Sequence, residues 1–513
     1  MDENKNTRVN NDRSPMMPTI LDLPSELIAN AVSFLPSDSD IFATRLSNKY
    51  LERSSLSHFG KQYFRKKGYM LTTPSLDVLQ FISTHDDLRK YVQHIWFNPD
   101  CFTFVRPDCA PDPQETPDPE NPESLLDLLS PSDRKKYEAY RECMKDHTSL
   151  ISDSAGRLQA KLAVILSNLP NLETVGMRRS EDHSPWGWSR LRDAVGEDPR
   201  VLGPIPSGPM RSVSSPTRLF MAVITAVAAA GVKLRRLYTD AIEIDSIPAQ
   251  ALTEEQLHAV CASIWYLEIN ATRAHLLWKE DPQTSASTYG EGLVRLLKAT
   301  TQLKEIGLQI FPDRKQSHLI APSYRDPESW RGSYPYLCLQ RIVDSVRLEH
   351  LTRVKLEKVT TSPGILLSFL SPCKVNMTSL KIRDVRLLSD EHESRPWQSI
   401  FTFLHRSCPN LEYLLFYHLM YETGGVSFVE DPPMPLPPSE TDPTTGAPNP
   451  PYGEPAGGEL FSRYEHIALE TKGVGEVSRR VGEVVERHWY HQPMFSYAMD
   501  DGLWHTDTSD EEE

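Results

Sequence analysis

The chain of 513 residues lacks the cysteine pattern and the long apolar runs that mark secreted and membrane proteins. Its seven cysteines include no CxxC pair, and the closest two, Cys101 and Cys109, lie in a proline-rich stretch. Scattered cysteines in odd number are typical of reduced thiols, so we expect neither a disulfide framework nor a zinc site. The longest apolar run, from Phe220 to Val232, is shorter than the roughly 18–20 residues that cross a bilayer. The polar N-terminus also lacks the apolar core of a signal peptide. We therefore expect an intracellular protein, cytoplasmic or nuclear, with no membrane partner.

Excess positive charge is also absent. The formal net charge is −15 and the pI is about 5.6, whereas domains that bind phosphate backbones usually have a basic face or a pI above roughly 9. The last residues, from Asp507 to Glu513, add further acid and predict a solvated tail. Nucleic acid is therefore not an expected partner.

Motifs for nucleotide binding and nucleophilic catalysis are missing as well. The sequence contains no GxGxxG, no GxxxxGK[ST] and no GxSxG. His488 and His491 are three residues apart with no cysteine nearby, and His405 and Cys408 are similarly isolated, so neither pair predicts a metal site. We expect no catalytic residue, no metal and no cofactor.

Proline, by contrast, is abundant: 41 residues, in clusters. The stretches 107–123 and 429–459 combine proline with acidic or glycine residues and few large apolar side chains, a composition typical of disordered linkers and loops.

The N-terminal region has a helical pattern. Pro24 stands where a helix favours proline, and apolar residues then recur at helical spacing until Pro36 ends the stretch. Ser37 begins a polar turn that predicts the N-cap of a second helix, and Asn48 predicts the cap of a third.

The string LDLPSELIANAVSFLPSDSDIFATRLSNKYLERSS resembles an F-box, in which Leu-Pro-x-Glu-Leu/Ile precedes an apolar stripe, a short acidic turn and a third helix. The stretch that follows resembles fungal members of the family. The third helix departs from the pattern, because Ser47-Asn48-Lys49-Tyr50 stands where the family often has Cys-(Arg/Lys)-x-Trp.

The resemblance implies that this segment binds a Skp-type adaptor and, through it, a cullin. The residues on the family's positions are Leu23, Pro24, Glu26, Leu27, Ile28, Val32, Leu35, Ile41 and Leu46. A short helical hairpin cannot bury all of these apolar groups, so a partner is expected to cover the surplus. The alternative is that they form the core of a helical cap on the rest of the protein.

The body carries a repeated pattern, apolar-x-x-apolar-x-apolar, often after a helical segment and a polar turn. Such helix–turn–strand units are typical of leucine-rich repeats, although here they start roughly 26 to 62 residues apart, against a usual spacing of 20–29. The copies begin at Leu172, Ile264, Leu303, Leu351, Met377 and Leu411, with a weaker one at Leu234.

The predicted fold class is therefore α/β: an N-terminal helical F-box, then an irregular leucine-rich-repeat-like solenoid, with disordered proline-rich loops and an acidic tail. The expected segments are a disordered N-terminus at 1–17, the F-box at 18–66, a helical region at 67–106, a linker at 107–123, the repeat body at 124–425, a loop at 429–459, a packing segment at 460–505 and the tail at 506–513.

Together these features predict a non-catalytic adaptor of a ubiquitin ligase, with the F-box on the ligase and the repeats on a target protein. The target is expected on the concave strand face, near Glu268, Lys304, Lys355 and Lys381. A scaffold acting outside any ligase fits the same sequence. A leucine-rich enzyme would need clustered, perturbed titratable groups in a pocket.

Overall fold

A computed structural model describes most of the chain between Thr19 and Arg487. The described residues are 19–99, 129–152, 156–178, 185–196, 215–239, 242–243, 252–272, 290–310, 334–388, 395–421, 424–426, 428 and 468–487. The segments expected to be disordered, at 1–17, 107–123, 429–459 and 506–513, lie outside them, as do His488 and His491.

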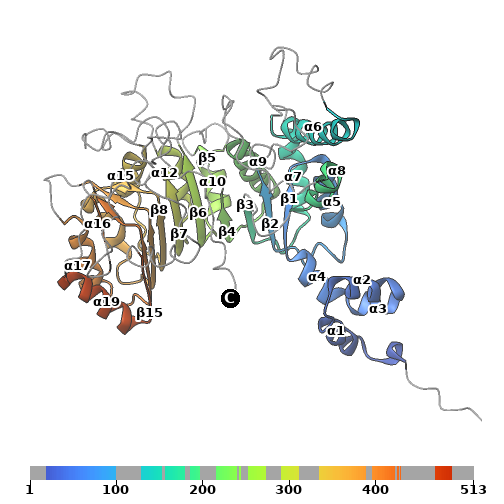
Figure 1. The fold of residues 1–513 in the computed structure, drawn as a ribbon, viewed down its shortest axis with the longest axis horizontal. Coiled ribbons are helices and arrows are strands. Elements are labelled where there is room, and N and C mark those ends of the chain that lie inside the picture. Colours follow the sequence, from blue (N-terminus) through green and yellow to red (C-terminus); the bar gives the residue numbers. More distant parts are fainter. Residues whose placement is uncertain are drawn as a thin grey trace, which may run out of the picture.

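One long sheet runs through the body (Figure 1), with eleven strands in the spatial order β1-β2-β3-β4-β6-β7-β8-β10-β12-β15 and β5 paired to β6. Neighbouring strands are parallel, except that β12 and β15 are antiparallel. The strands are β1 (Lys66–Met70), β2 (His94–Asn98), β3 (Thr174–Met177), β4 (Arg236–Tyr238), β5 (Ile242–Glu243), β6 (Tyr266–Thr272), β7 (Glu305–Ile310), β8 (Arg353–Glu357), β10 (Ser379–Arg383), β12 (Tyr413–Tyr417) and β15 (Ala468–Lys472).

A helix precedes each parallel strand from β2 to β12 (β5 apart), and neighbouring helices contact one another in the same order as the strands. This arrangement is a helix–strand solenoid, in which each unit packs mainly on its neighbours. The helices are α5 (Thr73–Thr84), α7 (Arg157–Ser167), α9 (Ser215–Ala230), α10 (Glu254–Cys261), α12 (Glu291–Ala299), α15 (Tyr334–Ser345), α16 (Pro363–Leu370, followed by the 3-10 turn η6, Ser371–Cys373) and α17 (Trp397–Ser407).

The repeated apolar pattern forms the core between this helix layer and the sheet. In each of the six full copies the first apolar residue lies in the turn and the next two lie on the strand, and all of them are buried. Side chains alternate along a strand, so the residues between them point away from the helices. The pattern therefore predicted both the strands and the buried face of the sheet.

The sheet begins earlier than the sequence predicted. Segment 67–106, expected to be helical, contributes β1 and β2 as well as α5. Val92, Ile95 and Phe97 repeat the apolar pattern and are buried, so this stretch carries a copy that went unrecognised. The body at 124–425 thus continues a sheet that starts at Lys66.

A second, four-stranded sheet follows the ends of the last repeats, with β9 (Thr360–Thr361), β11 (Arg386–Leu387), β13 (Met420–Tyr421) and β14 (Gly424–Gly425). Lys358, Asp384 and His418 turn the chain between the two sheets with positive φ angles of 55°, 52° and 51°. The left-handed conformation is costly for residues other than glycine. Stacking across repeats stabilises it: the amide of Lys358 donates to the Arg383 carbonyl at 3.0 Å, and His418 Nδ1 lies 2.8 Å from Asp384 Oδ1.

Asparagine side chains also join consecutive repeats. Asn171, Asn376 and Asn410 each occupy the turn before a strand, and each amide donates to a carbonyl of the preceding repeat: to Lys90 at 2.6 Å, Glu349 at 2.9 Å and Val375 at 2.8 Å. The Pro-Asn-Leu-Glu sequence shared by 170–173 and 409–412 thus places an asparagine where its amide can donate to the preceding repeat.

We expect Asn410→Ala to lower the free energy of unfolding by about 1 kcal/mol, because one hydrogen bond between repeats is lost. Asn410→Asp keeps the shape but replaces the donor by an acceptor, so it should cost at least as much. Urea denaturation measures both; variants as stable as the wild type would mean that this bond adds nothing.

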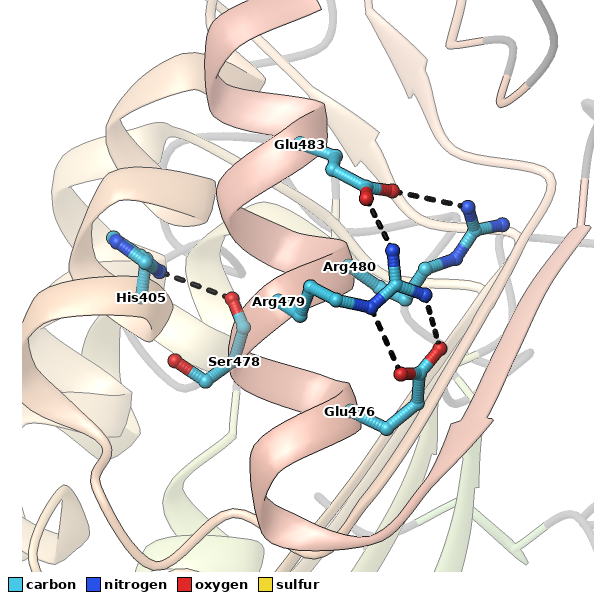
Figure 2. Close-up of polar contacts among 6 residues, drawn as sticks. All are labelled: His405, Glu476, Ser478, Arg479, Arg480 and Glu483. Atoms are coloured by element: carbon cyan, nitrogen blue, oxygen red, sulfur yellow. Dashed lines mark hydrogen bonds and ion pairs between the residues drawn. The ribbon is translucent and has the colours of Figure 1, made fainter.

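The C-terminal part of the described chain closes the array. Strand β15 covers the edge of β12, and α19 (Val474–Arg487) packs on α17, where Ser478 provides the carbonyl 3.2 Å from His405 Nδ1. Figure 2 shows that Arg479 lies between Glu476 and Glu483, while Arg480 contacts Glu483 at 3.1 Å. These ion pairs are on the solvent side of α19, whereas Val477, Val481 and Val484 face the core.

The other end carries two further helices, α6 (Pro131–Ile151) and α8 (Trp188–Val195), which pack together over Met70. Asp146 of α6 accepts hydrogen bonds from the Thr73 amide at 2.6 Å and its hydroxyl at 2.7 Å. The next residue, His147, is buried, and its Nδ1 lies 3.1 Å from the Leu71 carbonyl.

Stability is expected to fall on acidification through His147. Burial lowers the pKa of its imidazole from 6.5 to about 4, although the Leu71 and Pro99 backbone and Asp146 act in the opposite direction. Between these values the unfolded chain binds a proton that the folded chain does not, so stability is lost as pH falls from about 6.5 to about 4. The loss attributable to this group is about 3 kcal/mol.

His147→Gln does not titrate, so the difference in unfolding free energy between variant and wild type should narrow across this range. Denaturation at pH 7 and pH 4.5 measures it; a difference that stays constant would contradict the assignment.

Candidate functional site

The N-terminal helical unit, residues 20–64, consists of a 3-10 turn and four short helices. They are η1 (Ile20–Asp22), α1 (Ser25–Ser33), α2 (Asp38–Ser47), α3 (Lys49–Ser54) and α4 (Leu56–Phe64). The two predicted caps are confirmed: Ser37 Oγ accepts from the Asp40 amide at 3.2 Å, and Asn48 Oδ1 from the Tyr50 amide at 2.7 Å. Pro24 is itself the N-cap of α1.

This unit has a core of its own, separate from that of the solenoid. Ile28, Val32, Ile41 and Leu51 are buried together, with Leu35, Phe59 and Tyr63 packed around them. The unit lies beyond the β1 end of the sheet and is joined to it by α4 (Figure 1). It is therefore a projecting helical lobe.

Exposed apolar side chains are concentrated on this lobe. Of the thirteen large apolar residues that are exposed in the described chain, eight lie between residues 20 and 50. Apolar patches of this kind usually mark interaction surfaces. We call the eight the lobe surface: Ile20, Leu21, Leu23, Leu27, Phe34, Phe42, Leu46 and Tyr50.

The nine residues predicted from the sequence divide into two groups. Leu23, Pro24, Glu26, Leu27 and Leu46 are exposed, and Leu46 retains 86% of its accessible surface. Ile28, Val32 and Ile41 are only 1–3% exposed, and Leu35 is half-buried. Only the first group is therefore accessible to a partner, and the adaptor interface itself stays a prediction. The buried residues support the surface, because their side chains are already covered within the lobe.

The residues predicted from the sequence do not include the other five members of the lobe surface, Ile20, Leu21, Phe34, Phe42 and Tyr50. Phe34 is 78% exposed just outside the predicted stripe, at the end of α1. Tyr50 donates its hydroxyl to the Leu23 carbonyl at 2.9 Å. It thereby ties α3 to the loop that carries Leu23.

The second candidate surface is the open face of the sheet, on the side away from the helix layer. Residues in register cross it in a single row from Gly68 through Trp96, Gly176, Tyr238, Glu268, Gly307, Lys355, Lys381 and Leu415 to Glu470. Three of the four residues predicted to contact a target, Glu268, Lys355 and Lys381, lie in this row. Lys304 does not, because it lies in the turn before β7.

Two glycines in this row make room for aromatic rings. A Cβ atom added to Gly68 would lie 2.0 Å from the Trp96 ring, and one added to Gly176 would lie 1.9 Å from the Tyr238 ring. The rings therefore lie flat across the glycines. Tyr238 also contacts His94, whose Nε2 is 2.7 Å from its hydroxyl.

A charged cluster occupies the middle of the open face. Lys355 Nζ lies 3.2 Å from Glu268 and 3.4 Å from Glu357, and the Tyr266 hydroxyl donates to Glu268 at 2.7 Å. Burial would raise the pKa of Glu268, but Lys355, Tyr266 and Arg178 lower it overall. The pKa of Lys355 is raised by its two carboxylates despite burial. Both groups are therefore charged at neutral pH.

Four of the described thiols carry little nucleophilic character. Burial raises the pKa of Cys143 and Cys373 to about 11 and that of Cys261 and Cys408 to about 12. Thiols with such values stay protonated at neutral pH. Within the described residues, no cluster of three or more His, Cys, Asp or Glu side chains is arranged to hold a metal ion. No described helix is both long and apolar enough to span a bilayer.

Comparisons with known proteins add little to this picture. No protein family model matches the chain, and no curated protein is similar to it in sequence. A solved structure with some likeness is the crystal structure of the leucine-rich repeat-containing protein LegL7 from Legionella pneumophila. It is 11% identical, with 69% of this chain and 90% of that chain covered, and the TM-score is 0.25. A TM-score this low carries no argument, so the repeat fold rests on the strand pairing of this chain.

Proposed function

We propose that this chain is the substrate-binding subunit of a Skp–cullin–F-box ubiquitin ligase. The observation that carries the proposal is the lobe surface: a helical unit with its own core exposes eight large apolar side chains, including Leu23, Leu27 and Leu46 of the F-box-like pattern. A Skp-type adaptor would cover them, and a cullin would bind through the adaptor.

The mechanism is proximity. The lobe fixes the chain to the ligase, the solenoid holds a target, and ubiquitin transfer gains because a bimolecular encounter becomes effectively intramolecular. The reactive cysteine belongs to a separate conjugating enzyme. The raised pKa values of Cys261 and Cys408 are consistent with a non-catalytic role for these thiols.

The test is co-purification of the tagged full chain with the Skp-type adaptor and a cullin, beside a variant carrying Leu23→Ala and Pro24→Ala. Both residues are exposed, so the variant is expected to fold. Recovery of both proteins with the wild type and of neither with the variant supports the ligase assignment. If neither protein binds the wild type, the assignment fails.

The second candidate is a scaffold that binds the adaptor outside any ligase, since the same lobe surface and solenoid serve that role. Recovery of the adaptor without the cullin would favour it. So would a target half-life that is the same with and without this chain.

A further inference from the structure

The two ends of the long sheet differ in how their edges are covered. At the first end, Trp186 lies beside β1: its amide donates to the Gly68 carbonyl at 2.7 Å, and its carbonyl accepts from the Met70 amide at 3.1 Å. At the other end β15 is the last strand, and no strand of the described chain pairs with its second edge. An unpaired edge offers backbone donors and acceptors to another strand.

The register of β15 shows which of its backbone groups face outward. The Gly473 amide donates to the Glu412 carbonyl at 2.7 Å, so this pair is hydrogen-bonded between the two strands. Hydrogen-bonded pairs alternate along an antiparallel ladder, so every second residue of β15 bonds to β12. The residues in between present their amide and carbonyl groups to the open edge: Ala468, Glu470 and Lys472. No hydrogen bond within the described chain engages these backbone groups.

The side chains at this edge carry charges of opposite sign. Glu470 and Lys472 point to the open face, and their side chains are 51% and 74% exposed. They form an ion pair at 3.3 Å within the chain, but exposed ion pairs stabilise little, so both remain available to a second partner. Charges of one sign would repel a second copy of the same edge, whereas charges of opposite sign make the edge complementary to itself.

We propose that the β15 edge binds a second copy of this chain, antiparallel about a twofold axis at Thr471, so that the two sheets become continuous. In this register Glu470 of each copy lies opposite Lys472 of the other, and two pairs of opposite charge flank the axis. Each pair exchanges two backbone hydrogen bonds, about four in all. A register centred on Glu470 would form more hydrogen bonds, but it places two carboxylates directly opposite each other, which is unfavourable.

A twofold arrangement uses the same surface on both copies, as closed dimers do. The lobe lies beyond β1, at the opposite end of the sheet (Figure 1), so the two lobes stay at the far ends of the dimer. A five-residue edge buries less area than a stable interface, so we expect a dissociation constant on the order of 10 μM. Pairing at this edge is independent of the proposed function, because the lobe plays no part in it.

Sedimentation velocity of the full chain from about 1 to 100 μM measures the dimer. Glu470→Lys makes both edge charges positive and Lys472→Glu makes both negative, so each variant alone should dimerise at least about tenfold more weakly than the wild type. An equimolar mixture of the two should form a heterodimer about as well as the wild type dimerises, because each charge again meets its opposite. The chain with both substitutions should also dimerise like the wild type.

Glu349→Lys and Lys298→Glu are the matched controls, because both residues are exposed outside the edge and their reversal changes the net charge equally. Each should dimerise within about twofold of the wild type. Glu470→Pro removes an amide that points outward, which an edge strand tolerates, whereas Glu470→Gln keeps it. The proline variant should therefore dimerise at least about tenfold more weakly than the glutamine variant.

A wild-type chain that stays monomeric up to about 100 μM would overturn the proposal. So would a mixture of Glu470→Lys and Lys472→Glu chains that forms no heterodimer, an equal loss in the control variants, or equal dimerisation of the proline and glutamine variants. Circular dichroism checks the fold of each variant; should Glu470→Pro unfold, the charge variants make the test by themselves. No adaptor is present, so these outcomes are independent of the co-purification, which tests the lobe alone.

Discussion

Trp397→Ala is expected to lower the free energy of unfolding by about 3–5 kcal/mol, because a fully buried aromatic side chain is removed from a packed core. Trp397 is 0% exposed and stacks on Phe401 one turn along α17. Its indole N–H also donates to the Met420 carbonyl in β13 at 2.8 Å. The residue therefore joins the helix layer to the second sheet in the last parallel repeat.

Urea denaturation followed by circular dichroism measures this loss, and Trp397→Phe is its control. Phenylalanine keeps most of the ring but cannot donate to Met420, so about 1–3 kcal/mol should be lost. Since solenoid units contact mainly their neighbours, hydrogen exchange should rise in β10 and β12 more than in β2 and β3. A uniform rise along the array, or a loss below about 1 kcal/mol in Trp397→Ala, would contradict this account.

The repeated apolar pattern predicted the strands of the body because its period is local. Alternation alone, with no knowledge of distant contacts, placed Val354 and Leu356 inward and Lys355 outward, as found. The same rule would have identified β2, where Val92, Ile95 and Phe97 repeat the pattern. That copy went unrecognised because the surrounding residues resembled a helical extension of the lobe, although a polar turn with Asp86, Asp87 and Arg89 precedes it.

The sequence alone does not predict the register between neighbouring strands. That Glu268, Lys355 and Lys381 lie in one row follows from pairing of β6, β7, β8 and β10, whose spacing along the chain varies with each insertion. Lys304 was misplaced for the same reason, since one residue decides whether it lies on the strand or in the turn before it. The attachment of α6 also depends on distant contacts: Asp146 and His147 bind residues that lie 73 and 76 positions earlier in the sequence.

For the lobe, the helical stripe predicted which residues form it, but not which of them stay exposed. A stripe of aliphatic residues on a short helix looks the same in sequence whether its side chains face inward or outward. Only the packing of α1 against α3 and α4 separates Ile28 and Val32, which are covered, from Leu27, which is 53% exposed. This separation makes the adaptor assignment testable residue by residue.

We expect Leu46→Asp to weaken adaptor binding about 150- to 900-fold, about 3–4 kcal/mol, while leaving the stability of the lobe unchanged. Leu46 is 86% exposed, so aspartate meets water in the free chain but an apolar partner surface in the complex. Ile28→Ala should behave in the opposite way. Ile28 is 1% exposed, so the lobe would lose about 2–5 kcal/mol of stability, and binding would weaken only as far as the lobe unfolds.

Calorimetric titration of the adaptor, beside thermal unfolding of each variant, separates the two effects. Val164→Asp is the matched control for Leu46→Asp, because Val164 is 53% exposed on α7 of the solenoid, and it should bind the adaptor like the wild type. If Leu46→Asp binds normally while Ile28→Ala does not, the lobe surface is not the interface. In that case the adaptor binds another surface, one that depends on the folded core around Ile28.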